Sequence, residues 1–268
     1  MIDQGRNNVM GVVIDAVDYE RAVAKIIESA QQGKRCATTA LAVHGLITGV
    51  TDEAHRFRLN QFDLVVPDGQ PVRWALNVLH RAQLTDRVYG PKLSLRVCEA
   101  AARQGVSVYF FGSSKTVIQK LCEGMSRRCP GLQIAGARPS EFRTLTEAER
   151  NELVAEIQAS GAQILFVGLG CPRQEVFAYE MSQYLNMPIL AVGAAFDYYA
   201  GTLTEPPEFM QKWGLQWLYR LVQEPRRLWK RYLVTNTQFV ALFGMQAIGL
   251  WRPDPANCKA PLTEVRYG

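Results

Sequence analysis

The chain has 268 residues, 48% of them hydrophobic and 21% charged, which is enough apolar material for one sizeable globular core with an appendage. The net charge is only +5, so nucleic acid is not an expected partner. Six scattered cysteines form no Cys-x-x-Cys pair and have only three histidines beside them, which argues against a structural zinc site and for a reduced cytosolic setting. The first ten residues carry no apolar run and predict no signal peptide.

Short apolar, β-branched runs alternate with amphipathic helical patterns through the first 192 residues. Strands are expected at residues 12–14, 35–39, 63–66, 106–111, 132–136, 163–167 and 188–192. Helices are expected at residues 19–32, 51–60, 92–104, 116–128 and 146–160, and in a segment that ends near Leu185. Gly33 marks the end of the first helix, and Thr146 with Glu149 forms a capping box. This alternation predicts an α/β fold, a Rossmann-like parallel sheet with helices on both faces.

The positive charge is concentrated in residues 212–231, where six cations face the single acid Glu224. The cations are Lys212, Arg220, Arg226, Arg227, Lys230 and Arg231. Trp213, Trp217 and Trp229 are interleaved with them, and such rings tolerate one wet and one apolar side. One interpretation is a solvated helix face with ordinary core residues behind it. The other, which we favour, is a surface for anionic lipid, a phosphate-bearing ligand or both.

Pro225 divides this basic segment into two helical patterns, each with its own apolar stripe, so the arginines around it are expected at a helix–helix corner. Residues 232–251 are uncharged and long enough to span a bilayer, but several Thr, Asn and Gln side chains make them a poor span. We therefore expect three parts. They are an α/β catalytic core at 1–204, a helical membrane-docking appendage at 205–251, and a loosely ordered tail at 252–268.

In parallel α/β sheets, ligands bind at the carboxyl ends of the strands, where the strand order switches. These ends are expected at residues 38–39, 67–69, 112–114, 168–175 and 193–197. Gly168 and Gly170 could open a dinucleotide fingerprint, but Arg173 replaces its third glycine, so a tight strand-to-helix turn is the simpler interpretation. The helix that follows still offers free backbone N–H groups to an anion such as diphosphate.

Asp68 is the acid that we single out, because it lies at a strand end between proline and glycine. A carboxylate there would face the cleft as a base, or it would cap the helix that begins near Gln70. Asp197 and Arg87 have a comparable ambiguity between a functional and a structural role. The chain has no Asp-x-Asp pair to hold a divalent metal, so no cofactor is expected and Arg and Lys must neutralise any phosphate leaving group.

Five segments, in a fixed order between Val9 and Tyr232, follow a known pattern. They are Val65-Val-Pro-Asp-Gly69, Arg87-Val-Tyr-Gly90, Val167 to Glu175, Gly193 to Gly201 and Gly214 to Tyr232. Together they resemble bacterial glycosyltransferase family 26, which includes N-acetylmannosaminyltransferases and exopolysaccharide glucosyltransferases. The resemblance implies an inverting, metal-independent transfer of a sugar from a UDP-sugar to a polyprenyl-diphosphate-linked saccharide, in bacterial cell-surface polysaccharide synthesis.

The resemblance also implies roles for residues of the core. By motif position, Asp68 corresponds to the catalytic base, Arg87 to a phosphate contact, and Gln174 and Asp197 to substrate-pocket residues. The other implied site residues are the cleft threonine, which is Thr38 or Thr39, and Gly168, Gly170 and Glu175 of the same glycine-containing block. A carboxylate that removes the acceptor proton and cations that stabilise departing UDP make a coherent chemistry.

The appendage has implied roles as well. Arg220, Arg227 and Lys230 fall where the family supplies cations to the active site while it docks peripherally on the inner face of the cytoplasmic membrane. The chain departs from the family pattern at Ala40 or Leu41, at Lys92 and at Glu205, so the donor sugar is left open. The acceptor and the oligomeric state, a homo-oligomer included, are open too.

Two other classes of function remain as alternatives. A nicotinamide-dependent oxidoreductase would need an acid about 20 residues beyond the glycine turn to bind the ribose hydroxyl, and residues 186–188 offer none. A non-catalytic, membrane-docked nucleotide-sugar-binding protein would keep the basic helices and lack the cleft chemistry.

Overall fold

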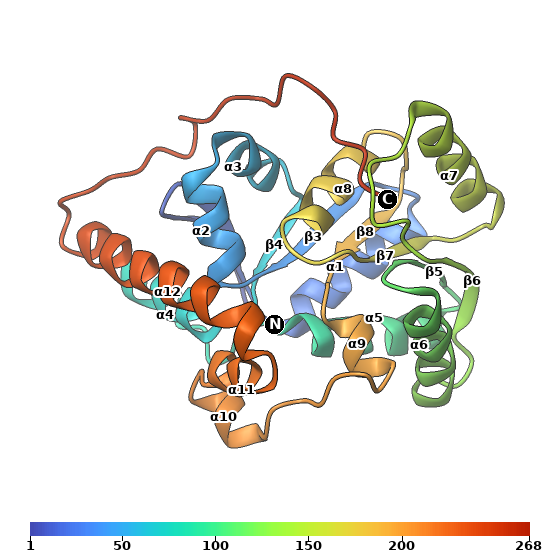
Figure 1. The fold of residues 1–268 in the computed structure, drawn as a ribbon, viewed down its shortest axis with the longest axis horizontal. Coiled ribbons are helices and arrows are strands. Elements are labelled where there is room, and N and C mark those ends of the chain that lie inside the picture. Colours follow the sequence, from blue (N-terminus) through green and yellow to red (C-terminus); the bar gives the residue numbers. More distant parts are fainter.

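The computed structural model describes residues 1–268, apart from the side chain of Arg227. Its centre is a six-stranded, wholly parallel sheet with the strand order β4-β3-β8-β7-β5-β6 (Figure 1). The strands are β3 (Cys36–Leu41), β4 (Leu64–Pro67), β5 (Ser107–Gly112), β6 (Gln133–Arg138), β7 (Ile164–Gly168) and β8 (Pro188–Ala191). Five of the six are buried along most of their length, because helices cover both faces of the sheet. The predicted Rossmann-like α/β fold is confirmed.

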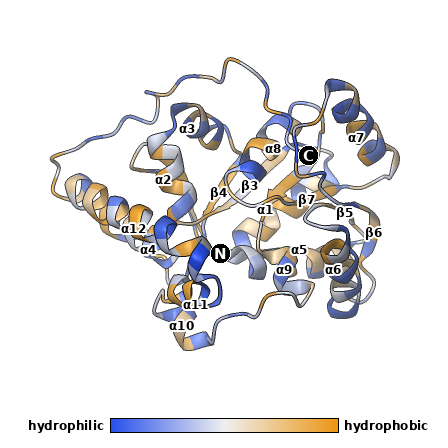
Figure 2. Cartoon of the chain, viewed as in Figure 1, coloured by the Kyte–Doolittle hydropathy of each residue, from blue (hydrophilic) through white to orange (hydrophobic). Residues whose placement is uncertain are grey.

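Two groups of helices bury the two faces. One face packs against α2 (Val43–Thr51), α3 (Glu53–Asn60), α4 (Gln70–His80), α7 (Glu147–Ala159) and α8 (Arg173–Met181). The other packs against α1 (Tyr19–Gln31), α5 (Gly90–Gln104), α6 (Lys115–Arg128) and α9 (Ala195–Tyr199). Alternate residues of one strand serve the two layers, as Tyr109 and Phe110 of β5 do. Figure 2 shows hydrophobic residues in the strands of the sheet and a largely hydrophilic α7 at the periphery.

The amino-terminal strands differ from the expectation. The strand predicted near residue 12 is β2 (Val12–Val17), but it lies outside the main sheet and pairs antiparallel with β1 (Asp3–Val9). The sequence analysis missed β1 because its residues are mostly polar and exposed. The carboxylate of Asp15 in β2 accepts the backbone N–H of Val65 at 2.7 Å. The hairpin is thereby fixed beside β4, the edge strand of the main sheet.

Three helices follow the core: α10 (Glu208–Lys212), α11 (Gln216–Gln223) and α12 (Pro225–Ala247). The helix break predicted at Pro225 is confirmed. The predicted apolar stripe of α12 buries Thr235 and Phe239, while the Gln246 side chain near its other end accepts the N–H of Met10 at 2.9 Å. None of the described helices is both long and apolar enough to cross a membrane.

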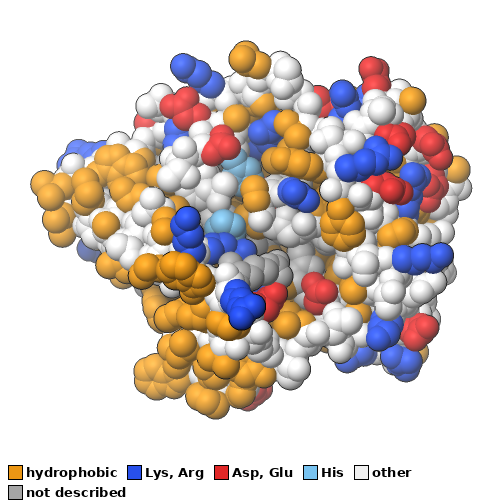
Figure 3. Space-filling model, viewed as in Figure 1, with side chains coloured by type: hydrophobic (Ala, Val, Ile, Leu, Met, Phe, Trp, Pro, Cys, Tyr) orange, Lys and Arg blue, Asp and Glu red, His pale blue; other side chains and the backbone are white. Residues whose placement is uncertain are grey.

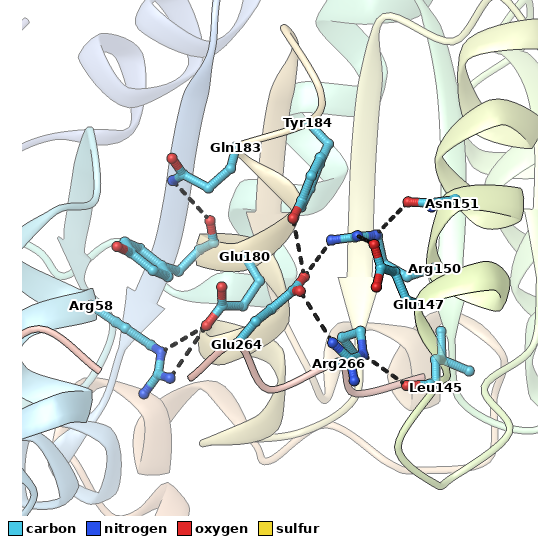
Figure 4. Close-up of polar contacts among 11 residues, drawn as sticks. Arg58, Leu145, Glu147, Arg150, Asn151, Glu180, Gln183, Tyr184, Glu264 and Arg266 are labelled. Carbon is cyan, nitrogen blue, oxygen red and sulfur yellow. Dashed lines mark hydrogen bonds and ion pairs between the residues drawn. The ribbon is translucent and has the colours of Figure 1, made fainter. Parts of the chain in front are cut away.

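The tail after α12 is ordered by contacts with the core, so the expectation of a loosely ordered tail is wrong. It returns from the end of α12, past α3, to the side of α7 (Figure 1). Arg56 donates to the carbonyl of Asn257 at 2.7 Å, and Arg150 pairs with Glu264 at 2.6 Å (Figure 4). The backbone of Thr144 forms an isolated antiparallel bridge with Tyr267. Ion pairs and backbone bonds between such distant residues cannot be predicted from the local amino-acid composition of the tail.

Candidate active site

Asp68 follows β4 directly, and its backbone N–H is bonded to the carbonyl of Leu41 in β3 at 3.1 Å. Its carboxylate accepts the N–H of Gly90, the first residue of α5, at 3.2 Å. Gly69, not Asp68, caps α4, and no side chain makes the capping bond, so the interpretation of Asp68 as the cap of that helix is wrong. The side chain is left at the carboxyl edge of the sheet with a single backbone donor.

The environment of Asp68 makes it a stronger base than an ordinary aspartate. Burial disfavours the charged form and raises the pKa of its carboxyl to about 6, although the positive charges of Arg87 and Arg220 and the Gly90 N–H oppose the rise. A base with a pKa near the working pH is ionised at neutral pH and still holds a proton well enough to accept one in a reaction. These properties suit acid–base chemistry at Asp68.

Arg87 joins the core to the appendage at this position. Its side chain is 5% exposed, its guanidinium lies 4.5 Å above the ring of Tyr89, and it donates a hydrogen bond to the side-chain carbonyl of Gln216 in α11. Arg220, one turn further along α11, pairs with Glu224 at 3.3 Å. The helix α11 therefore contacts Arg87 and brings the charge of Arg220 near Asp68, although Arg87 and Gln216 are 129 positions apart along the chain.

Two donors at this contact are available to a ligand. Among the described residues, the Nε of Arg220 and the Nε2 of Gln216 are buried side-chain atoms without a hydrogen-bond partner. A buried donor with no partner costs free energy, on the order of 1–3 kcal/mol. A bound oxyanion would recover that cost, because a guanidinium and an amide both donate to phosphate oxygens.

The two candidate threonines of β3 lie on opposite faces of the sheet. The hydroxyl of Thr39 donates to Glu175 at 3.2 Å, whereas that of Thr38 bonds back to the carbonyl of Cys36 at 3.2 Å, within its own strand. Successive side chains of a strand alternate between faces, so only one of them can turn toward the α8 side. The structure brings Thr39, and not Thr38, to the residues of the glycine-containing block.

Gln174 and Glu175, at the start of α8, tie the loops of this edge together. The side-chain carbonyl of Gln174 accepts the N–H of Gly170 at 3.1 Å, and its amide donates to Glu175 at 2.9 Å. A β-carbon at Gly193 would lie 2.7 Å from the same Gln174 oxygen, so that loop approaches Gln174 closely. Glu175 is 1% exposed, and burial raises the pKa of its carboxyl despite the bonds from Gln174 and Thr39.

The remaining candidates lie in different surroundings. A β-carbon at Gly168 would be 2.5 Å from the ring of Phe196, so packing alone requires a glycine there. Asp197 is half-buried in α9, and its carboxylate accepts the hydroxyl of Thr202 at 3.3 Å. Lys230 is exposed on α12, and no described contact links it to Asp68. The side chain of Arg227 lies outside the described part of the structure.

Sequence reasoning missed two aromatic residues of the site and one amide. Tyr89 and Tyr198 are buried beside Asp68 with their ring centroids 6.4 Å apart, and Gln216 contacts Arg87. The tyrosines belong to the segments at 87–90 and 193–201, so a search of those segments for buried polar rings could have found them. Within the described residues no group of three His, Cys, Asp or Glu side chains is arranged to hold a metal ion.

The fold and the site define an α/β protein whose sheet carries an acid and two arginines at its carboxyl edge, a set of groups that suits a phosphate-bearing ligand. Residues 7–253 match the model of the glycosyl transferase WecG/TagA/CpsF family. The chain belongs to this family, and the resemblance inferred from the five segments is confirmed.

A curated relative from Bacillus spizizenii is an N-acetylglucosaminyldiphosphoundecaprenol N-acetyl-beta-D-mannosaminyltransferase. It is 30% identical to this chain over 176 residues, which is 65% of this chain and 66% of that protein. The match therefore spans slightly less than two thirds of the relative's length.

Proposed function

We propose that this protein is an inverting, metal-independent glycosyltransferase that moves a sugar from a UDP-sugar to a polyprenyl-diphosphate-linked saccharide. Membership of a glycosyl transferase family supports transfer of a sugar, and the name of the Bacillus relative supports a lipid-diphosphate acceptor. The observation that carries the mechanism is the half-buried carboxyl of Asp68 at the carboxyl edge of the sheet, which accepts the Gly90 N–H and is acted on by the charges of Arg87 and Arg220.

In this mechanism Asp68 accepts the proton of the acceptor hydroxyl. The hydroxyl oxygen then bonds to the anomeric carbon of the donor sugar as the bond from that carbon to the phosphate oxygen breaks. UDP leaves with the bonding electron pair. A single displacement of this kind inverts the configuration of the anomeric carbon, and it needs the base and the leaving group on opposite sides of the sugar.

The charge that develops on UDP is neutralised by arginines in place of a metal. Arg87 and Arg220 are the described cations whose charges lower the pKa of Asp68. Arg227 is a third candidate cation, from its position in the family motif. Donors that are fixed where charge develops in the transition state account for a large part of catalysis in many enzymes. Thr39, Gln174 and Glu175 position the donor in this scheme.

We also propose that residues 205–251 dock on the anionic inner face of the cytoplasmic membrane. Large apolar side chains are exposed there, with Phe209 at 61%, Trp213 at 74% and Trp229 at 55%. Figure 3 shows hydrophobic side chains gathered on the surface over this part of the molecule. The same segment also carries Lys212, Arg226 and Lys230. Interfacial aromatics and cations together favour a peripheral position on lipid, which would bring Asp68 to a lipid-linked acceptor.

We propose that the parts of the chain have the boundaries expected from the sequence. Residues 1–204 form the catalytic core, residues 205–251 both dock and complete the site, and residues 252–268 are the tail. The hydrogen bond between Arg87 and Gln216 supports the double role of the appendage.

A panel of UDP-sugars, incubated with the purified protein and a short-chain lipid-diphosphate saccharide, tests the proposed function. Mass spectrometry should find an acceptor heavier by one sugar, and chelators should leave the yield unchanged. Binding of a UDP-sugar without transfer to any acceptor would favour the non-catalytic, membrane-docked alternative. Loss of transfer with EDTA and recovery with Mg²⁺ would contradict the metal-independent mechanism.

A further inference from the structure

The strand order of this sheet switches direction between β5 and β7. After β5 the chain continues to β6, at one edge of the sheet. After β7 it continues to β8, which lies in the opposite direction. The neighbouring strands β5 and β7 therefore mark the point where the strand order switches. Such a switch point, at the carboxyl ends of the strands, is where open α/β sheets bind nucleotides. Here the N–H of Ser113, after β5, donates to the carbonyl of Gly168 at 3.0 Å.

The last residues of the tail cover this position. The N–H of Ser140 donates to Ser113 at 3.0 Å, and the Ser140 hydroxyl donates in turn to the carbonyl of Gly268. The guanidinium of Arg173, at the start of α8, lies 5.6 Å from the ring centre of Tyr267. Residues 267 and 268 therefore lie against the loops that follow β5, β6 and β7.

The space that remains is small. A cavity of about 80 Å³ lies between the loops and the tail, and Ser140, Arg143, Leu169, Arg173 and Tyr267 are among the residues that line it. Pockets that hold ligands of nucleotide size measure about 300–1,000 Å³. Arg173 and the Ser140 hydroxyl suit an anionic ligand, while Arg143 is already paired with Glu149. The volume does not accommodate a nucleotide while the tail is in place.

The tail is held by contacts that water can replace. Glu264 accepts from Arg150 at 2.6 Å, from Arg266 at 3.4 Å and from Tyr184 at 3.5 Å, as Figure 4 shows. Two backbone bonds, from Leu145 to Arg266 at 2.6 Å and from Gly268 to Arg143 at 2.9 Å, and a bond from the Arg266 side chain to the carbonyl of Leu145 at 3.1 Å add to the contacts of Ser140 and Arg173 described above. Leu262, just before it, is fully exposed. No large apolar side chain of this segment enters either core cluster among the described residues.

We infer that the segment 264–268 is a releasable plug of the nucleotide crevice, which must leave before the uridine diphosphate part of the donor can bind. This inference rests on the proposed function, because it takes a UDP-sugar as the donor. The segment lies beyond residue 253, where the match to the family model ends. Tail docking and UDP binding exclude each other, and the measured affinity for UDP is lowered by the fraction of molecules in which the plug is docked.

Charge reversal at Glu264 tests the plug in the full-length chain. Glu264→Arg places a third guanidinium beside Arg150 and Arg266 and should release the segment. Leu262→Arg introduces the same side chain two residues earlier at a fully exposed position, and it is the matched control. In calorimetric titrations with UDP, we expect Glu264→Arg to bind about tenfold more tightly than the wild type and Leu262→Arg to bind like the wild type.

If Glu264→Arg misfolds, a milder variant and a measurement on the unmodified protein still test the inference. Tyr267→Ala leaves Glu264 paired with Arg150 and should tighten UDP binding less, in the same direction. In hydrogen–deuterium exchange on the wild type, addition of UDP should accelerate exchange at residues 264–268. Slower exchange there with UDP, or UDP affinity that is equal or weaker in Glu264→Arg, would mean that the tail is a wall of the site and not a plug.

The same data separate this inference from the proposed function. If the wild type transfers sugar from a UDP-sugar while all variants bind UDP equally, the plug is refuted and the proposed function stands. If neither the wild type nor Glu264→Arg binds UDP, the assignment of a UDP-sugar donor fails, and the plug fails with it.

Discussion

The two ends of the carboxyl edge are covered by different parts of the same carboxyl-terminal region. At the β4 end, α11 contacts Arg87 through the buried amide of Gln216 and brings the charge of Arg220 near Asp68. At the β5–β7 end, residues 264–268 are held mainly by ion pairs and backbone bonds, with side chains that are partly exposed. The first cover adds functional groups to the site, and the second adds none and fills space. We therefore expect α11 to support activity and residues 264–268 to oppose it.

The largest effect is expected from the residue beneath the first cover. Asp68→Asn should lower transfer by about 10²–10⁴-fold, because the amide still accepts the Gly90 N–H but cannot take the acceptor proton. UDP affinity and the melting temperature should change little. Glu123→Gln, at an exposed acid of α6, is the control. Turnover near the wild-type rate would remove Asp68 from the role of base.

A smaller loss is expected when the cover loses a cation. Arg220→Ala should reduce turnover by about 100-fold on a soluble acceptor analogue, since a donor at developing charge commonly contributes that much. Arg226→Ala removes the same charge from an exposed position of α12 and should leave that turnover unchanged. Equal, small losses in both variants would show that the appendage only anchors the enzyme and does not complete its site.

The pH profile sharpens the same comparison. In the proposed mechanism the carboxylate form of Asp68 is the active one, so with a pKa of about 6 kcat/KM should rise tenfold per pH unit below pH 6 and level off above it. Arg220 lowers this pKa, so the step should move to higher pH in Arg220→Ala. Initial rates between pH 4.5 and 8.5 measure both midpoints. A step that stays in place would mean that Arg220 does not act on Asp68.

The smallest effect is expected at the outer face of the appendage. Trp213→Ala should weaken sedimentation with anionic liposomes only about fivefold, because several aromatic rings and cations share the docking. Turnover on a soluble analogue should be unaffected, since the ring is 74% exposed. Leu262→Ala, a fully exposed residue of the tail, is the control for lost apolar surface. A parallel loss of turnover would place Trp213 in the site.

Most elements of the core could be predicted from the sequence, but fewer residues of the site could be. Each predicted strand exists, because a buried parallel strand is a short apolar run, and Pro225 divides the helices because it cannot continue the first one. β1 escaped notice because its polar residues carry no strand pattern. Periodicity could not decide between Thr38 and Thr39, because that choice depends on which face meets α8.

Contacts between distant segments account for the rest. The pair of Arg87 with Gln216, and the attachment of Glu264 to Arg150 across 114 residues, have no local signature. Gly168 had suggested a nucleotide loop, but the ring of Phe196 is the visible reason for a glycine there. Local propensity therefore identified the elements, while packing determined which residues share the site.

The long separation between Arg87 and Gln216 also means that their contact can form only late in synthesis of the chain. Translation at about 5–20 residues per second takes roughly 6–26 s to add the 129 residues between them. The sheet itself waits for β8, which is inserted between β3 and β7 although it is made last. A nascent chain on the ribosome thus carries Asp68 for many seconds without the helix that covers it. Under the proposed function, catalytic competence and the membrane-docking surface would emerge together, so no donor sugar would be consumed before the protein could reach a lipid-linked acceptor.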